Sequence, residues 1–253
     1  MGKLRFDLSG KTAIVTGGGR GLGRTIALAL AEAGADVSVA SRKLENCESA
    51  AAEIRALGRR ALAVPCHMGK PEEVDELFET TIAELGRVDI VFNNSATNPA
   101  AHPLVTATSE LFDRVYAINV KGPMLLASRA AAWMADHGGG VVVNVISVAA
   151  FRPGATIGLY SSSKAALFSL TRVMAQEWAP LGVRVNALAP GPVRTDMVKA
   201  VEGTGFHDAM VDSTLMKRVA PPEELIEAAL FLASDASSYM TGQALVIDGG
   251  VMA

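Results

Sequence analysis

The stretch Thr-Ala-Ile-Val-Thr-Gly-Gly-Gly-Arg-Gly-Leu-Gly, residues 12–23, decides the fold of this 253-residue chain. Residues 12–16 are β-branched or apolar and predict a buried strand, and the glycines after them predict a tight turn into a helix over 22–33. Such a turn lets a pyrophosphate approach the backbone at the helix N-terminus. The spacing of Gly17, Gly21 and Gly23 differs from Gly-x-Gly-x-x-Gly, so an ordinary strand-to-helix connection is the alternative.

The same alternation of strand and helix continues along the chain. Further strands are predicted over 37–40, 61–64, 90–93, 141–146, 183–188 and 244–247, and further helices over 44–57, 72–85, from Ser109 onward, 159–178 and 223–232. The predicted fold class is therefore α/β: one Rossmann-type domain over residues 1–253, with a doubly wound seven-stranded parallel sheet and helices on both faces.

Residues 190–220 are the long segment without a predicted element. A segment of this length in a compact domain is typical of a lid or substrate loop. Its apolar residues, Met197 and Phe206 among them, are then expected to close over a ligand. A surface helical hairpin that packs them against the body is the alternative, and the sequence leaves both open.

Composition and charge exclude several classes of protein. The net charge is 23 − 26 = −3 and there is no basic run, which argues against nucleic acid or an anionic membrane as the main partner. The isolated Cys47 and Cys66 predict neither a disulfide framework nor a zinc site, and four scattered histidines predict no other metal site. Without a signal peptide or an apolar run long enough to span a bilayer, the protein is expected to be cytoplasmic and to act on a small molecule.

Three polar side chains are predicted to meet at the carboxyl edge of the sheet. Tyr160 and Lys164 are four residues apart and share one helix face, and Ser147 ends the fifth strand. Lowering a tyrosine pKa from about 10 to about 7 takes about 4 kcal/mol. Two unit charges ~4 Å apart at an effective dielectric of ~20 interact by a similar amount, so one lysine is expected to be sufficient to activate the phenol. Taken alone, the pair also fits an ordinary solvated helix face.

These motifs together resemble the short-chain dehydrogenase/reductase family over essentially the whole chain. They follow the family's order: the glycine turn, Asn93-Asn94, Asn119 in Tyr-Ala-Ile-Asn-Val, Ser147, Tyr160, Lys164 and Pro190-Gly191. The resemblance implies a Rossmann-type fold, a nicotinamide cofactor and a catalytic tetrad of Asn119, Ser147, Tyr160 and Lys164. It also implies that Asn119 holds a water linking Lys164 to solvent.

The residue after the second predicted strand favours NADP(H) as the cofactor. An acidic side chain there would bind the ribose hydroxyls of NAD, but the chain has Ser41 followed by Arg42. With Arg20 in the glycine turn, Arg42 is expected to hold the 2′-phosphate. The full set expected to contact the cofactor is Gly17, Arg20, Gly21, Leu22, Gly23, Ser41, Arg42, His67, Met68, Asn94, Ser95, Ala96, Tyr160, Lys164, Pro190, Gly191, Val193 and Thr195.

Two motifs depart from the family pattern. Many relatives have an Asp after the third strand that hydrogen-bonds the adenine, whereas this chain has Cys66-His67-Met68, so His67 either contacts the base or caps the strand. Asn94 is followed by Ser95-Ala96 where the family usually reads Ala-Gly. These stretches resemble the branch with the peroxisomal NADP-dependent carbonyl and retinal reductases, but the chain does not end in a Ser-Lys-Leu type signal.

The side chains expected around the substrate are mostly apolar. They are Thr97, Ser147, Ala149, Phe151, Leu159, Met197 and Phe206. With Arg152 as the only nearby cation, a ketone or aldehyde with hydrophobic substituents is favoured over an acidic substrate.

Three alternatives and the state of assembly stay open. A 3-oxoacyl-thioester reductase shares these motifs. Enoyl reductases of related fold usually space the tyrosine and lysine further apart. A non-catalytic NADP-binding regulator would lack one of Ser147, Tyr160 and Lys164, and all three are present. The resemblance also implies a homotetramer or dimer, built through the long helix after Tyr160 and the last helix and strand.

Overall fold

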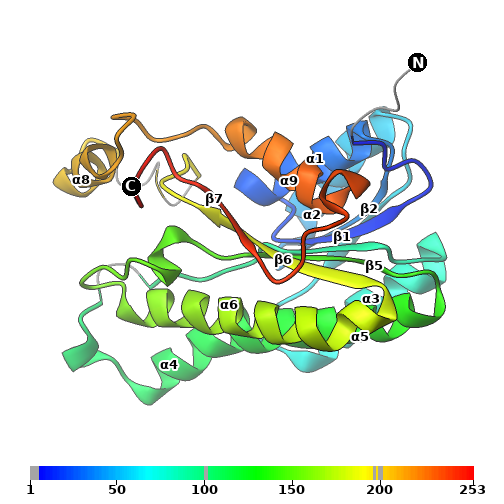
Figure 1. Cartoon of the computed structure of the whole chain (residues 1–253), viewed down its shortest axis with the longest axis horizontal. Helices are drawn as coiled ribbons and strands as arrows, with labels where there is room; N and C mark the ends of the chain where they lie inside the picture. Colours follow the sequence, from blue (N-terminus) through cyan, green and yellow to red (C-terminus); the bar gives the residue numbers. More distant parts are fainter. Residues whose placement is uncertain (1–5, 100–101, 196–197, 199–201) are drawn as a thin grey trace.

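Seven parallel strands form one sheet in the computed structural model, which describes residues 6–99, 102–195, 198 and 202–253 (Figure 1). The order across the sheet is β3-β2-β1-β4-β5-β6-β7. The strands are β1 (Thr12–Thr16), β2 (Asp36–Ser41), β3 (Ala61–Pro65), β4 (Ile90–Asn93), β5 (Gly140–Val145), β6 (Val183–Pro190) and β7 (Ala244–Ile247). Every neighbouring pair is parallel, so all carboxyl ends meet at one edge.

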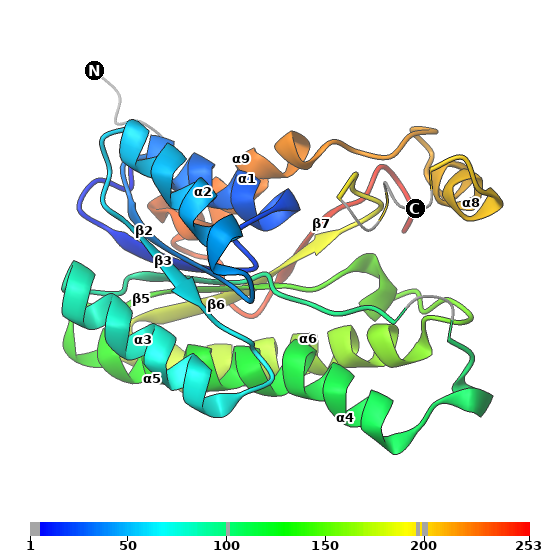
Figure 2. The same cartoon turned by 180° about the vertical axis from the view of Figure 1, so that it is seen from behind.

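Helices cover both faces of the sheet. One face carries α1 (Gly21–Glu32), α2 (Leu44–Ala56) and α9 (Ile226–Ala233) (Figure 2). The other face carries α3 (Pro71–Leu85), α5 (Gly122–Asp136) and α6 (Gly158–Trp178), with α4 (Ser109–Tyr116) beside α6. The helix α8 (Gly205–Ser213) lies at one end of the molecule, near the C-terminus in both views. Short 3₁₀ turns occupy 104–106, 148–150, 179–181, 222–225 and 235–237.

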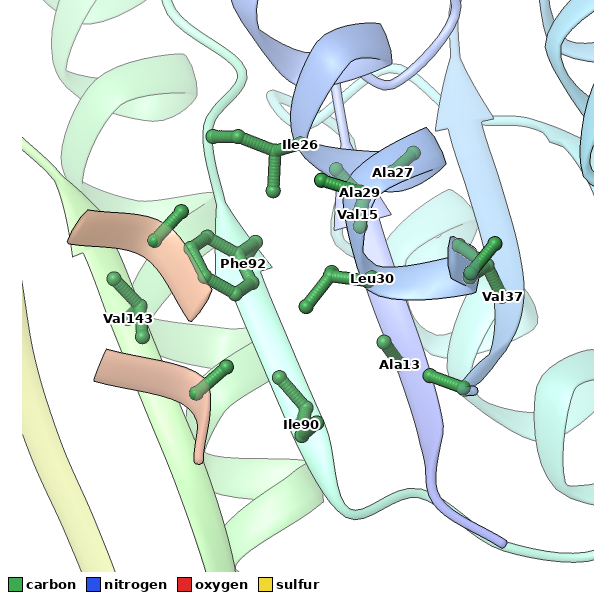
Figure 3. Close-up of a cluster of buried hydrophobic side chains, with 14 of the residues drawn as sticks. Ala13, Val15, Ile26, Ala27, Ala29, Leu30, Val37, Ile90, Phe92 and Val143 are labelled. Atoms are coloured by element: carbon green, nitrogen blue, oxygen red, sulfur yellow. The ribbon is translucent and has the colours of Figure 1, made fainter. Parts of the chain in front are cut away.

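The core has two layers because each strand is apolar on both sides, as strands of a covered parallel sheet must be. On β1, Ala13 and Val15 face the α1 layer whereas Ile14 faces the α3 layer. Figure 3 shows Ile26 and Leu30 of α1 packed over the sheet. The predicted fold class is confirmed: a single Rossmann-like α/β domain.

The strand order reverses at β1, whose two neighbours are β2 and β4. In a doubly wound sheet, the crossover helices on either side of such a reversal leave the sheet in opposite directions, and ligands bind in the crevice between them. The glycine turn after β1 and Asn94 after β4 both lie at this point.

Two segments differ from the sequence prediction. The helix predicted from Ser109 onward is divided by a π-helical segment, Ala117–Lys121, which separates α4 from α5. Residues 190–220 contain α8, and none of the residues of α8 is buried. Val193 and Val198 in the same segment are buried, whereas Phe206 on α8 is 50% exposed. Val193 and Val198 therefore pack against the body of the protein, whereas Phe206 does not.

Candidate active site

The glycine turn is tight because another loop lies against it. A Cβ on Gly23 would lie 2.3 Å from the carbonyl oxygen of Gly17 and 2.4 Å from Nδ2 of Asn94, so no larger residue fits. At Gly21 a Cβ would meet nothing nearer than Thr195 at 3.7 Å, and the positive φ of 51° is the reason for glycine there. The turn is therefore tightly packed at Gly23, against Gly17 and Asn94, and open at Gly21, on the side of Thr195.

Thr16, at the end of β1, connects the glycine turn with the loop after β4, and the sequence reasoning missed this role. Its buried Oγ1 accepts hydrogen bonds from the backbone N–H groups of Asn94 and Ser95, each at 3.0 Å. Asn94 Nδ2 donates to the carbonyl oxygen of Thr16, also at 3.0 Å. The only signal in the sequence was a polar residue at the end of an apolar strand.

The N-terminus of α1 has the properties of an anion site. The N-cap residue Arg20 makes no side-chain capping hydrogen bond, and the first turn contains no acidic residue. The first N–H groups of a helix lack partners within the helix and carry partial positive charge. The buried Leu22 packs this turn against the core. The residues present therefore fit a pyrophosphate.

The end of β2 carries the predicted ribose-binding residues. Ser41 is half-buried, and its Oγ lies 3.1 Å from Sγ of the buried Cys47 and donates to the carbonyl oxygen of Lys43 at 3.2 Å. Arg42 is exposed and lines a cavity with His67. Gly19 of the turn lies over this corner, since a Cβ there would be 3.0 Å from Ser41 Oγ.

The side chain of Asn119, which lies in the π-helical segment, uses both of its polar atoms in hydrogen bonds. Its Oδ1 accepts from the N–H of Thr97 at 2.8 Å, and its Nδ2 donates to the carbonyl oxygen of Thr97 and to Ser163 Oγ, both at 2.9 Å. Ser163 Oγ in turn donates to the carbonyl oxygen of Tyr160 at 2.7 Å. Both N–H groups of the Asn119 side chain are thus in use, so it acts as a brace between the β4 loop and α6. A water held by Asn119 would have to use its backbone oxygen or the remaining lone pair of Oδ1.

Ser147, Tyr160 and Lys164 come together as the sequence predicted. Ser147 is the polar neighbour of the Tyr160 hydroxyl group, and its side chain lowers the pKa of the phenol. Ser147 Oγ also accepts from the N–H of Ala149 at 3.1 Å. Lys164 is 1% exposed, its Nζ donates to the carbonyl oxygen of Val145 at 2.7 Å, and Nζ lies 5.8 Å from the centroid of the Tyr160 ring.

The pKa of Tyr160 corrects one expectation. Burial raises the pKa of the phenol, and the hydrogen bond with Ser147 opposes this only in part. Burial also lowers the pKa of the Lys164 ammonium to about 7. The expectation that Lys164 lowers the pKa of Tyr160 is therefore wrong for the chain by itself. Desolvation of the phenol is the largest cause, and the opposing interaction is the one with Ser147, so Lys164 does not bring the pKa of Tyr160 below its ordinary value.

The predicted substrate residues are only partly assembled. Ala149 and Leu159 are buried close to Ser147 and Tyr160 in the chain. Phe151 packs edge-on against Phe168, with 5.2 Å between the ring centroids, in a small cluster under α6. Phe206 is half exposed on α8, and Met197 lies outside the described residues.

The remaining predicted cofactor residues lie along the same edge. Gly191 follows the buried Pro190 and packs against the residue after β7, because a Cβ there would be 2.7 Å from Cα of Asp248. Val193 forms a parallel bridge with Ala220. Met68 is buried after β3, and Ala96 is exposed in the loop after β4.

Two further features are absent from the described part of the chain. No group of three or more His, Cys, Asp or Glu side chains there is arranged to bind a metal ion. None of the described helices is long and apolar enough to cross a membrane.

Comparison with known proteins places the chain in a family. Residues 17–252 match the family model described as "Enoyl-(Acyl carrier protein) reductase". "Dehydrogenase/reductase SDR family member 4" of Oryctolagus cuniculus is 38% identical over 247 residues, covering 97% of this chain and 95% of that protein. The chain belongs to the short-chain dehydrogenase/reductase family. The family prediction made from the motifs is confirmed.

Solved structures of this family contain both nicotinamide cofactors. A 7α-hydroxysteroid dehydrogenase in complex with NADH is 36% identical, with a TM-score of 0.93 and coverage of 97% of this chain and 96% of that one. L-Sorbose reductase from Gluconobacter frateurii in complex with NADPH is 28% identical, with a TM-score of 0.93 and coverage of 98% and 99%. The likeness therefore supports a nicotinamide cofactor and leaves the choice between the two to the residues of this chain.

Proposed function

We propose that this short-chain dehydrogenase/reductase transfers a hydride between NADP(H) and the carbon of a ketone, aldehyde or secondary alcohol. The observation that carries the proposal is the grouping of Ser147 and Tyr160 with the buried amine of Lys164, whose Nζ lies 5.8 Å from the centroid of the Tyr160 ring. The cofactor, when bound, supplies or accepts the hydride at its nicotinamide ring.

Each polar residue has a distinct part in the proton transfer. Ser147 donates a hydrogen bond to the substrate oxygen and orients it toward Tyr160. A phenol with a raised pKa stays protonated at neutral pH, so Tyr160 is ready to donate its proton to a carbonyl oxygen during reduction. Lys164 has a pKa of about 7, so that it holds and releases a proton at neutral pH next to Tyr160. Asn119 keeps the β4 loop and α6 in place around this pair.

Arg42 is the residue that we expect to select NADPH. Replacing it with alanine removes a charge-assisted contact with the 2′-phosphate and should weaken NADPH binding by about 10- to 100-fold. NADH has no 2′-phosphate, so its Kd should change by less than about threefold. Isothermal titration measures both. The control is Arg114→Ala, which removes an exposed positive charge on α4. An unchanged ratio of the two Kd values in Arg42→Ala would contradict the assignment.

Two features of the lining of the site support a hydrophobic substrate. Ala149 and Leu159 are apolar and buried, and the guanidinium of Arg152 donates to the carbonyl oxygen of Val251 at 2.7 Å. These features support a hydrophobic ketone or aldehyde over a carboxylate.

The proposed activity is tested by NADPH oxidation with a panel of carbonyl compounds. Aliphatic ketones, aryl ketones, aldehydes and diketones should be reduced with a higher kcat/KM than acidic ketones. Preference for a 3-oxoacyl thioester would support the alternative activity, and turnover of an enoyl thioester would support the activity in the matched model's description. Tight NADPH binding with no turnover of any compound would point to a regulatory protein.

We also propose that the protein assembles as a homotetramer or dimer in the cytoplasm. Leu167 is buried in the core, Leu170 packs against it, and Val173 on the same helix is 44% exposed. Val246 on the edge strand β7 is 37% exposed. These side chains support an interface through α6 and β7, and light scattering measures the assembly.

A further inference from the structure

The carboxyl edge of the sheet has an open cavity of about 460 Å³ beyond the proposed ribose site. A dinucleotide with its pyrophosphate at α1 and its ribose phosphate at Arg42 would run outward along this edge, so that its base reaches the end of β3. The residues that line the cavity are Arg42, Pro65, Cys66, His67, Lys70, Glu73 and Glu76. The base is therefore expected to lie next to His67.

The hydrogen bonds of His67 determine which of its ring nitrogens carries the proton. Its Nδ1 lies 3.1 Å from the backbone N–H of Gly69 and accepts a hydrogen bond from it. A ring nitrogen that accepts a hydrogen bond carries no proton, so a neutral His67 is protonated at Nε2. A Cβ at position 69 would lie 2.9 Å from Cε1 of His67. The imidazole ring therefore fits because residue 69 is a glycine.

The Nε2–H group of His67 is available to a ligand. The ring is half-buried and lines the cavity, and within the described residues Nε2 has no hydrogen-bond partner. The backbone N–H of His67 already donates to Glu73 Oε2 at 2.7 Å. The imidazole thus presents a hydrogen-bond donor to the cavity.

The nearest carboxylate in this wall is already engaged. Glu73 accepts from Lys70 Nζ at Oε1 and from the His67 N–H at Oε2, both at 2.7 Å. Both hydrogen bonds lower the pKa of Glu73, and the one with Lys70 has the larger effect. They keep the carboxylate ionised and hold it in position. Glu76 is exposed further along α3, away from the start of that helix at the sheet edge. The part of the wall beside the base therefore offers a donor.

We propose that His67 recognises the base as a hydrogen-bond donor, so that the protein does not select for the 6-amino group of adenine. The N–H of His67 pairs with N1 of adenine, which is an acceptor, or equally with the 6-oxo group of hypoxanthine. Nicotinamide hypoxanthine dinucleotide phosphate is then bound as tightly as the adenine cofactor. The inference rests on the proposed dinucleotide-binding function and adds the base specificity of that site.

The test compares the Kd of NADPH with that of the reduced hypoxanthine analogue by isothermal titration of the full chain. We expect the two values to agree within about threefold. A hypoxanthine Kd more than about tenfold weaker, with NADPH still bound, would overturn the inference and leave the proposed function intact. Binding of neither compound would overturn the proposed function itself.

Two variants separate the donor role of His67 from simple packing. In His67→Asp the side chain becomes an acceptor, which should favour adenine over hypoxanthine by about tenfold. In His67→Phe the ring stays and the N–H is lost, so both compounds should bind more weakly by the same factor. Thermal unfolding confirms that each variant folds, and the wild-type comparison decides the question by itself if one does not. An unchanged preference in His67→Asp would contradict the donor role.

Discussion

Replacing Tyr160 with phenylalanine is expected to lower the rate of carbonyl reduction by about a thousandfold, because it removes the group that is proposed to donate the proton to the substrate oxygen. The phenol hydroxyl is the group beside Ser147, and phenylalanine keeps the ring while removing only that hydroxyl. NADPH should still bind with a Kd within about threefold of the wild type. Steady-state NADPH oxidation and titration measure the two effects.

A matched control removes a tyrosine hydroxyl elsewhere. Tyr239 is fully exposed between α9 and β7, so Tyr239→Phe should reduce carbonyl compounds at the wild-type rate. A folded Tyr160→Phe variant that reduces carbonyl compounds at the wild-type rate would contradict the proposed mechanism. The raised pKa of Tyr160 adds a dependence on pH: oxidation of the alcohol, which needs the deprotonated phenol, should rise from pH 7 toward alkaline values, whereas carbonyl reduction should not.

Replacing Lys164 with methionine is expected to abolish most activity and yet to stabilise the fold. The pKa of Lys164 falls from 10.5 to about 7 on burial, so the folded state carries a penalty on the order of 4 kcal/mol at pH 7. Methionine fills a similar volume without a charge but loses the hydrogen bond to the carbonyl oxygen of Val145. We expect a net gain of about 1–3 kcal/mol in the free energy of unfolding, with turnover reduced about a hundredfold.

The sign of the pH dependence makes this prediction specific. Below pH 7 both the folded and the unfolded chain hold the proton, and the full penalty applies. Between pH 7 and 10.5 the folded chain has released the proton while the unfolded chain keeps it, so wild-type stability rises with pH. The advantage of Lys164→Met should therefore be largest near pH 6 and shrink toward pH 9, as measured by urea unfolding at each pH.

The exposed Lys121 provides the matched control for this experiment. Lys121→Met should change the free energy of unfolding by less than about 0.5 kcal/mol and leave its pH dependence unaltered. A Lys164→Met variant that is less stable than the wild type at pH 6 would show that the buried ammonium is compensated by contacts that outweigh its desolvation.

Much of the fold could be predicted because local sequence and tertiary role coincide. Strands covered on both faces read as short apolar runs, and β1, β4 and β7 have the bounds predicted for them. The helix from Ser109 was less well predicted, because the π-helical segment at Asn119 has no distinct local signal. Residues 190–220 have no helical pattern in the sequence, because none of the residues of α8 is buried and its apolar residues form no stripe against the core.

The features of the candidate site also fall into two groups, those that the sequence predicted and those that only the tertiary structure shows. The chain alone determined that glycines follow β1, that Ser41 rather than an acid stands at the end of β2, and that Tyr160 and Lys164 share a helix face, because these depend on neighbours close in sequence. Only the tertiary structure decided that Thr16 binds the β4 loop, that Asn119 has no free N–H in its side chain, and which nitrogen of His67 is protonated. The direction of the pKa of Tyr160 belongs to this second group as well. Desolvation depends on which distant segments cover a group, and that is settled only when the chain has folded.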